Sequence, residues 1–127
     1  MKLICELWGE HPDIPRAELS CIGTVTEHRP QVAVADIVDP DLLSRLAYTH
    51  RAMRYRGECA ADEESFVTML QTLSLSVGRP FCGRVKKMEG HGMEASTTRL
   101  ESLIGKNIHG PVSVSAPELV FRAIISG

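Results

Sequence analysis

Apolar and polar positions alternate over short segments in the first part of the chain, a pattern typical of strands. Residues 2–8 form one predicted strand, and residues 31–38 (QVAVADIV) are so nearly continuous in apolar side chains that they predict a central strand. Between them, a helix is predicted to open at Pro15, because proline suits the first helical position, and residues 24–30 are predicted to be a turn region.

The pattern between residues 39 and 62 is less regular. Asp39-Pro40-Asp41 is compared with the D/N-P-P-Y/F motif of amino-methyltransferases, but it lacks the second proline and the aromatic residue of that motif. It is therefore interpreted as the start of a short helix that ends at Arg45 or Leu46. Residues 46–57 (LAYTHRAMRYRG) are ambiguous but alternate well enough for a strand. The pattern breaks after that segment, so a boundary between two small domains is predicted near residues 57–62.

Helical periodicity follows the break. Asp62, Glu63 and Glu64 suit the first turn of a helix, since acidic groups are favourable at a helix N-terminus. Residues 79–89 alternate as a basic strand, a loop follows at Gly90-His91-Gly92, and Ser96 or Thr97 can cap a second helix that ends at Gly105 or Gly110. Closing strands are predicted at residues 112–115 and 119–126, and the fold class is α+β. The two apolar stripes are Phe66, Met69, Leu70 and Leu73, and Leu100, Leu103 and Ile104.

Charge is distributed unevenly although the formal net charge is only −2. Residues 1–45 hold four cations against eight acids, whereas residues 66–127 hold seven cations against four acids. This polarity fits one face that meets phosphate, but on charge alone an ordinary solvated surface is the preferred interpretation. The four cysteines are too widely spaced to suggest a zinc site, and neither a signal peptide nor an apolar run of about 18 residues is present, so a cytoplasmic protein with reduced thiols is expected.

Two clusters of residues suit nucleic acid. On the basic strand, Arg84, Lys86 and Lys87 can bind backbone phosphates, or they can be a solvated strand face. The second cluster consists of basic and aromatic residues, namely His50, Arg51, Arg54, Tyr55 and Arg56. Its arginine and tyrosine side chains can stack on exposed bases. The alternative is that its charges lie on an edge strand and resist aggregation.

Other motifs carry less chemistry. Residues 90–95 (GHGMEA) fit G-x-G-x-x-A, but the further βα units of a dinucleotide-binding fold are missing, which leaves a phosphate-holding loop or a plain connector. Glu6, Glu10 and His11 suggest acid–base chemistry, yet no nucleophile is placed to complete a triad, and a turn is the preferred interpretation. No catalytic residue and no metal ligand is therefore assigned.

Residues 81–105 resemble the core of the THUMP domain, an RNA-binding module of tRNA-modifying enzymes. The family pattern of a strand F-x-V-R-V-K-R, a polar loop and a helix S-x-x-x-E-R-x-x-G is similar to Phe81 to Lys87 and Ser96 to Gly105, with Gly83 in place of the first valine. Residues 6–19 resemble the opening E-L-S-G-E-H-P of archaeal tRNA (guanine-N2) methyltransferases, with Trp8 in place of a small residue, and residues 111–122 resemble the closing THUMP strands.

This resemblance implies a ferredoxin-like N-terminal domain at 1–57 packed with a THUMP α/β domain at 58–127. It implies binding of the tRNA acceptor stem and 3′-CCA end, which positions tRNA for a methyltransferase domain that is not in this chain. S-adenosylmethionine is expected only in that missing domain. The alternative is a ferredoxin-like module that binds a small molecule or a protein and has no RNA function. Besides the two clusters above, the residues expected to contact RNA are His91, Arg99 and Lys106.

Overall fold

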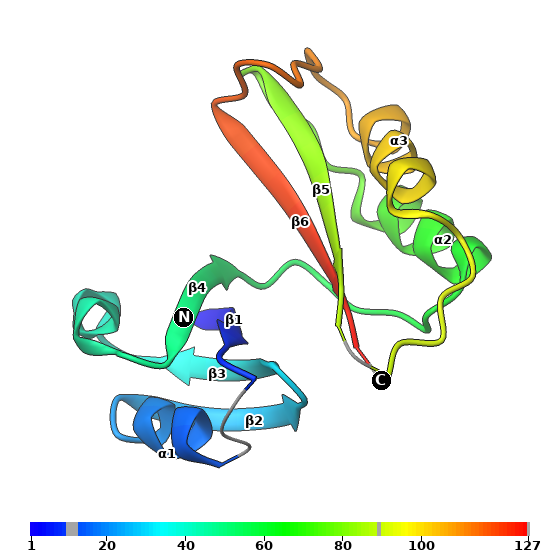
Figure 1. Cartoon of the computed structure of the whole chain (residues 1–127). Coiled ribbons are helices and arrows are strands. Elements are labelled where there is room, and N and C mark those ends of the chain that lie inside the picture. The colour runs from blue at the N-terminus through cyan, green and yellow to red at the C-terminus, as the bar shows by residue number, and fades with distance from the viewer. Residues whose placement is uncertain (10–12, 89, 127) are drawn as a thin grey trace. The chain divides into compact units, whose positions relative to one another are not determined.

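The computed structural model describes residues 1–9, 13–88 and 90–126 and shows a mixed α+β protein. By its internal contacts the chain divides into two compact units, Met1–Arg56 and Gly57–Gly127, and each is described by itself (Figure 1).

The unit Met1–Arg56 is a four-stranded antiparallel sheet with order β2-β3-β1-β4. Leu3, Cys5 and Leu7 of β1 pack with Leu19 of α1 on one face of this sheet, where β3 adds Ala33, Ala35 and Ile37 to the core. The predicted strands at residues 2–8 and 31–38 are confirmed, and so is the short helix at Asp39, whose carboxylate accepts a hydrogen bond from the Asp41 N–H at 3.1 Å. The elements are β1 (Lys2–Leu7), α1 (Ile14–Ser20), β2 (Gly23–Arg29), β3 (Val32–Ile37), the 3₁₀ helix η1 (Pro40–Arg45) and β4 (Thr49–Arg54).

The prediction of a turn at residues 24–30 is wrong, because strand β2 occupies most of this segment. As an edge strand, β2 pairs only with β3, and its side chains alternate between half-buried and exposed positions. An edge strand exposed in this way needs few apolar residues, so residues 24–29 (TVTEHR) show no apolar alternation, although the β-branched Thr24, Val25 and Thr26 favour a strand.

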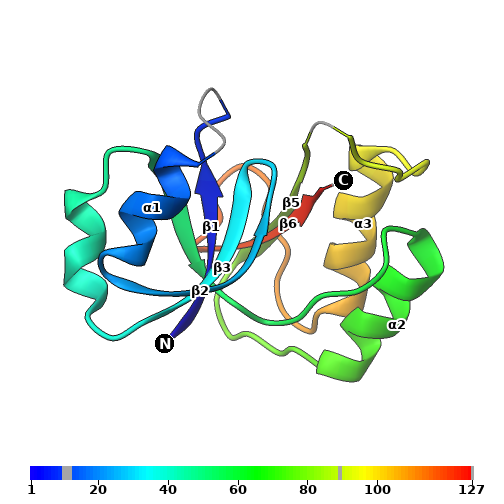
Figure 2. The ribbon, with the colours of Figure 1, turned by 90° about the horizontal axis from the view of Figure 1, so that it is seen from below.

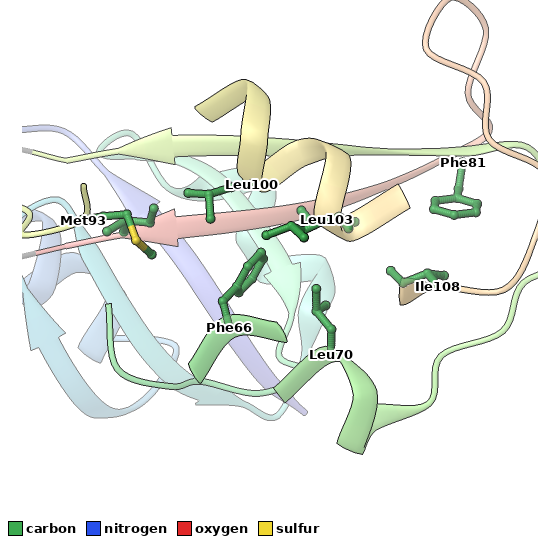
Figure 3. Close-up of a cluster of buried hydrophobic side chains, with 9 residues drawn as sticks. Phe66, Leu70, Phe81, Met93, Leu100, Leu103 and Ile108 are labelled. Atoms are coloured by element: carbon green, nitrogen blue, oxygen red, sulfur yellow. The ribbon is translucent and has the colours of Figure 1, made fainter. Parts of the chain in front are cut away.

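The unit Gly57–Gly127 is a β-α-β arrangement with a further helix. Strands β5 and β6 are parallel and are joined through α3, since parallel neighbours require a crossover connection. Both helices lie on one side of the strand pair (Figures 1 and 2). Side chains of α2 and α3, among them Phe66, Leu70, Leu100 and Leu103, point into a shared apolar cluster (Figure 3). The elements are α2 (Glu63–Leu73), β5 (Phe81–Lys87), α3 (Thr97–Asn107) and β6 (Leu119–Ile125).

Both predicted helices of this unit are confirmed with their caps: Asp62 accepts a hydrogen bond from the Ser65 N–H at 2.7 Å, and Ser96 from the Arg99 N–H at 3.1 Å. The end of α3 was predicted wrongly, because the helix passes through Gly105 and stops at Asn107. The strand predicted at residues 112–115 is also wrong. Only an isolated bridge forms there, between Phe81 and Val112, in a segment whose valines stay largely exposed.

Candidate nucleic-acid interface

Three cations lie on the face of the β5–β6 pair that points away from α3. Gly83 faces α3, since a Cβ atom built on it would lie 2.7 Å from the Ile104 Cβ. Alternation along the strand therefore puts Arg84 and Lys86 on the face away from the helix. Arg122 is the register partner of Arg84 on β6, so the two arginines share this face. We call these three residues, Arg84, Lys86 and Arg122, the basic face.

Arg84 is held in place by two hydrogen bonds to backbone carbonyls. Its guanidinium donates to the carbonyl oxygens of Gly83 at 3.2 Å and Val114 at 3.3 Å, and the side chain is half-buried. Lys86 and Arg122 are exposed. Neither β5 (FCGRVKK) nor β6 (LVFRAII) contains an acidic residue. Two arginines in direct register repel each other, and an anion bound on this face would relieve that repulsion.

Two of the predicted RNA-binding cations make intramolecular contacts on the helix side of the strands. Lys87 is half-buried, and its Nζ donates to the Ala95 carbonyl at 2.6 Å, which fastens the loop before α3 to the end of β5. Arg99 of α3 pairs with Glu63 of α2, with Nε at 2.9 Å and Nη2 at 2.7 Å from Oε1. The structure therefore does not bring Lys87 and Arg99 together with the basic face. Lys106 is exposed in the last turn of α3, where a cation complements the helix dipole.

The glycine segment 90–95 is anchored at several points. Met93 is buried in the core of the unit, and the Ala95 carbonyl accepts the Lys87 bond. His91 is half-buried, and its Nδ1 atom is buried. This atom has no hydrogen-bond partner in the part of the chain that the structure describes. Because it is buried, an RNA ligand cannot reach it in this arrangement. Ser96 already caps the N-terminus of α3. These contacts are those of a packed connector.

The second predicted cluster spreads over both faces of an edge strand. Strand β4 is at one edge of its sheet; Arg51 is the register partner of Glu6, and Arg54 is the partner of Leu3. Partners in register lie on the same face, so the two arginines point to opposite faces. Arg56 follows the strand, and all three arginines are exposed.

Aromatic contacts on β1 and β4 complete this region. The ring of Tyr55 is covered by the Lys2 Nζ, which lies 4.0 Å from its centroid. Trp8 and His50 stack with their ring centroids 4.7 Å apart and their planes at 12°. Trp8 and Arg122 were not among the residues predicted to bind RNA. Trp8 was noticed only as a departure from a family pattern, and the register that pairs Arg122 with Arg84 has no signal in the sequence.

Of the three residues that suggested acid–base chemistry, the structure describes Glu6. Glu6 is buried, with 5% of its surface exposed, whereas Glu10 and His11 lie outside the described residues. Burial raises the pKa of the Cys5 thiol to about 11. Burial, with a smaller effect of the Asp62 charge, also raises the pKa of Cys59. Within residues 1–9, 13–88 and 90–126, no three His, Cys, Asp or Glu side chains are grouped as metal ligands would be. The helices in these ranges are too short or too polar to cross a membrane.

Neither a protein-family model nor a curated protein sequence matches this chain.

Proposed function

We propose that this chain is a cytoplasmic tRNA-binding module that holds the acceptor stem and 3′ end of tRNA for a methyltransferase domain outside the chain. The single observation that carries the proposal is the basic face, because it places three cations on one surface of two strands that contain no acid. Residues two apart on a strand are about 6.6 Å apart, and neighbouring strands are about 4.8 Å apart, so the three charges can meet one phosphate backbone.

The topology of Met1–Arg56 supports the family resemblance. Strand β3 is antiparallel to both β1 and β2, so β1 and β2 run in the same direction with β3 between them and α1 connecting them. A ferredoxin-like domain would have this split β-α-β order, with the 3₁₀ helix η1 at the position of its second helix, so the order supports the proposal. In the proposal, S-adenosylmethionine belongs to the further domain, and the residues of this chain bind and orient RNA without a chemical step.

The test compares two variants that lose equal charge. In the double variant Lys86→Gln/Arg122→Gln, the slope of log affinity for tRNA against log salt should become shallower by about 1.4–1.8, because each lost phosphate contact removes about 0.7–0.9 released counterions. The matched control is Lys87→Gln/Arg99→Gln, which removes two cations that contact the Ala95 carbonyl and Glu63. Its slope should stay close to that of the unmodified chain, which fluorescence anisotropy with a labelled tRNA transcript can measure.

Equal slopes in both variants and the unmodified chain would place the RNA surface elsewhere. No salt-dependent binding of tRNA by the unmodified chain would remove the proposal and favour the small-molecule or protein-binding alternative.

A further inference from the structure

The stacked pair Trp8–His50 is an exposed aromatic surface that neither core cluster uses. Trp8 keeps 42% of its surface exposed, although a tryptophan side chain is largely apolar, and His50 is exposed beside it. The Trp8 N–H donates to the Tyr48 carbonyl at 3.0 Å, which fixes the backbone of Trp8 next to β4. The backbone of Trp8 is therefore held beside β4, and the stacking with His50 positions its indole ring.

A bulge turns His50 toward Trp8. Glu6 pairs with Arg51, but the next residue, Leu7, pairs with Thr49, so His50 is an extra residue on β4. Strict alternation would put His50 and Arg51 on opposite faces. The stacking shows that His50 shares the face of Trp8, which is also the face of Glu6 and Arg51. Bulges commonly re-aim side chains in this way, and here the bulge brings an imidazole, an indole and a guanidinium to one surface.

The charge around the pair indicates the kind of partner. Arg51 is exposed on the face of Trp8 and His50, its register partner Glu6 is buried, and Arg54 lies on the opposite face. An apolar peptide would leave the Arg51 guanidinium without an anionic partner, and an acidic peptide without aromatic residues would offer no flat π-face to the indole. A nucleic acid offers both a negative backbone and unpaired bases that stack on aromatic rings. Tyr55 is less suited to such stacking, because it is half-buried and the Lys2 ammonium covers its ring.

We propose that Trp8, supported by His50, is a stacking platform for one unpaired RNA base, with Arg51 beside it to contact the neighbouring phosphate. The platform rests on the proposed function and deepens it, because it gives the unpaired 3′ end of tRNA a site in Met1–Arg56. Paired A-form stems hide the faces of their bases, so the platform should respond to single strands and to free 3′ ends.

Trp8 is the chain's only tryptophan, so its fluorescence reports directly on the platform. Titration with a single-stranded 12-nucleotide RNA that ends in CCA should quench this fluorescence, and a blunt 12-base-pair RNA duplex should leave it nearly unchanged. The Trp8→Leu variant should bind the single strand about 5- to 150-fold more weakly, the range that the loss of one stacked base corresponds to. Trp8→Phe keeps an aromatic ring and should retain most of the affinity. The matched control is Val38→Ala, which trims a side chain that is 92% exposed elsewhere in the same unit.

The outcomes separate the two proposals. If tRNA binds with the expected salt dependence but Trp8→Leu binds the single strand as tightly as Val38→Ala, the platform is wrong and the proposed function stands. If a glutamate-rich peptide quenches Trp8 as strongly as the RNA does, the platform serves an acidic protein partner and the inference is overturned. If Trp8→Leu is unfolded by circular dichroism, Trp8→Phe and the fluorescence titration decide, and an unquenched signal counts against the platform.

Discussion

Replacing Gly83 by alanine should destabilise the unit Gly57–Gly127, because the glycine lets β5 approach α3 more closely than any side chain allows. A Cβ atom at this position would lie 2.7, 2.8 and 2.9 Å from the Cβ, Cγ2 and Cδ1 atoms of Ile104. Ile104 has only 2% of its surface exposed and belongs to the core cluster. The Ile104 Cβ is fixed to the helix backbone, so the contact cannot be relieved by rotating the side chain.

The expected magnitude follows from two opposing terms. Forcing an extra methyl group into a packed core typically costs about 1–3 kcal/mol. Alanine also restricts the unfolded chain more than glycine does, which offsets roughly 0.4–1 kcal/mol. The central values of the two terms predict that the free energy of unfolding falls by about 1.3 kcal/mol, and at most by about 2.6 kcal/mol. With a urea dependence of about 1–2 kcal/mol per molar, the unfolding midpoint should fall by roughly 1 M.

Urea unfolding followed by circular dichroism at 222 nm measures this change. The matched control is Gly78→Ala, because nothing lies within 4 Å of a Cβ atom built at Gly78. It should be neutral or slightly stabilising, by up to about 1 kcal/mol. The double variant Gly83→Ala/Ile104→Ala should lose less stability than the sum of the losses of the two single variants. The difference should be about 0.5–3 kcal/mol, as expected for residues in direct contact. Unchanged or increased stability of Gly83→Ala alone would refute the close-approach argument.

Two further predictions concern Met1–Arg56. The Glu18 carboxylate of α1 accepts hydrogen bonds from the backbone N–H groups of Ala47 at 3.0 Å and Tyr48 at 2.9 Å. Glu18→Ala should therefore lower the free energy of unfolding by about 1–3 kcal/mol. Glu18→Gln keeps one carbonyl acceptor and should lose less, and urea unfolding measures both variants. The pKa of Cys5 is raised to about 11 in the folded chain from a reference value of 9.0, so the folded state keeps a proton that the unfolded state releases. The resulting stability is fully present below pH ~9 and should be lost as pH rises through ~11. The loss in free energy of unfolding should be about 2–3 kcal/mol relative to the Cys5→Ala variant. Parallel plots of the free energy of unfolding against pH for the two proteins would contradict the burial of this thiol.

Elements that are buried enough to show a run or a periodic stripe of apolar residues could be predicted from the sequence. The apolar run at residues 31–38 became β3, the central neighbour of β1 and β2, because a strand paired on both sides is largely covered. The capped amphipathic helices α2 and α3 were also found, since caps and stripes are local features. Strand β2 was missed because an edge strand with half-exposed side chains looks like a polar turn. The end of α3 was predicted at Gly105 or Gly110, and neither glycine ends the helix. Gly105 lies inside α3, where a Cβ atom would have room. Gly110 lies beyond the helix, and its φ of 153° and the close Val77 carbonyl explain the glycine there.

The cations of the candidate site were visible in the sequence, but their partners were not. Lys87 and Arg99 were both predicted to contact RNA, yet Lys87 contacts a loop carbonyl and Arg99 contacts a glutamate 36 positions away. Such contacts depend on tertiary packing and leave no periodic signal. The pairing of Trp8 with His50 depends on a one-residue bulge, which shifts register without any characteristic sequence.

The two proposed RNA contacts rest on different physics, and salt should separate them. Binding to the basic face releases counterions, so substitutions there change the slope of log affinity against log salt. Stacking of a base on Trp8 moves no counterion, so Trp8→Leu should lower affinity by the same factor at every salt concentration and leave the slope intact. Parallel lines for Trp8→Leu and a shallower line for Lys86→Gln/Arg122→Gln would show two separable contributions, one that attracts the backbone and one that recognises an unpaired base. A shallower slope in Trp8→Leu would instead mean that loss of the ring also displaces a phosphate contact, with Arg51 the nearest candidate on that face.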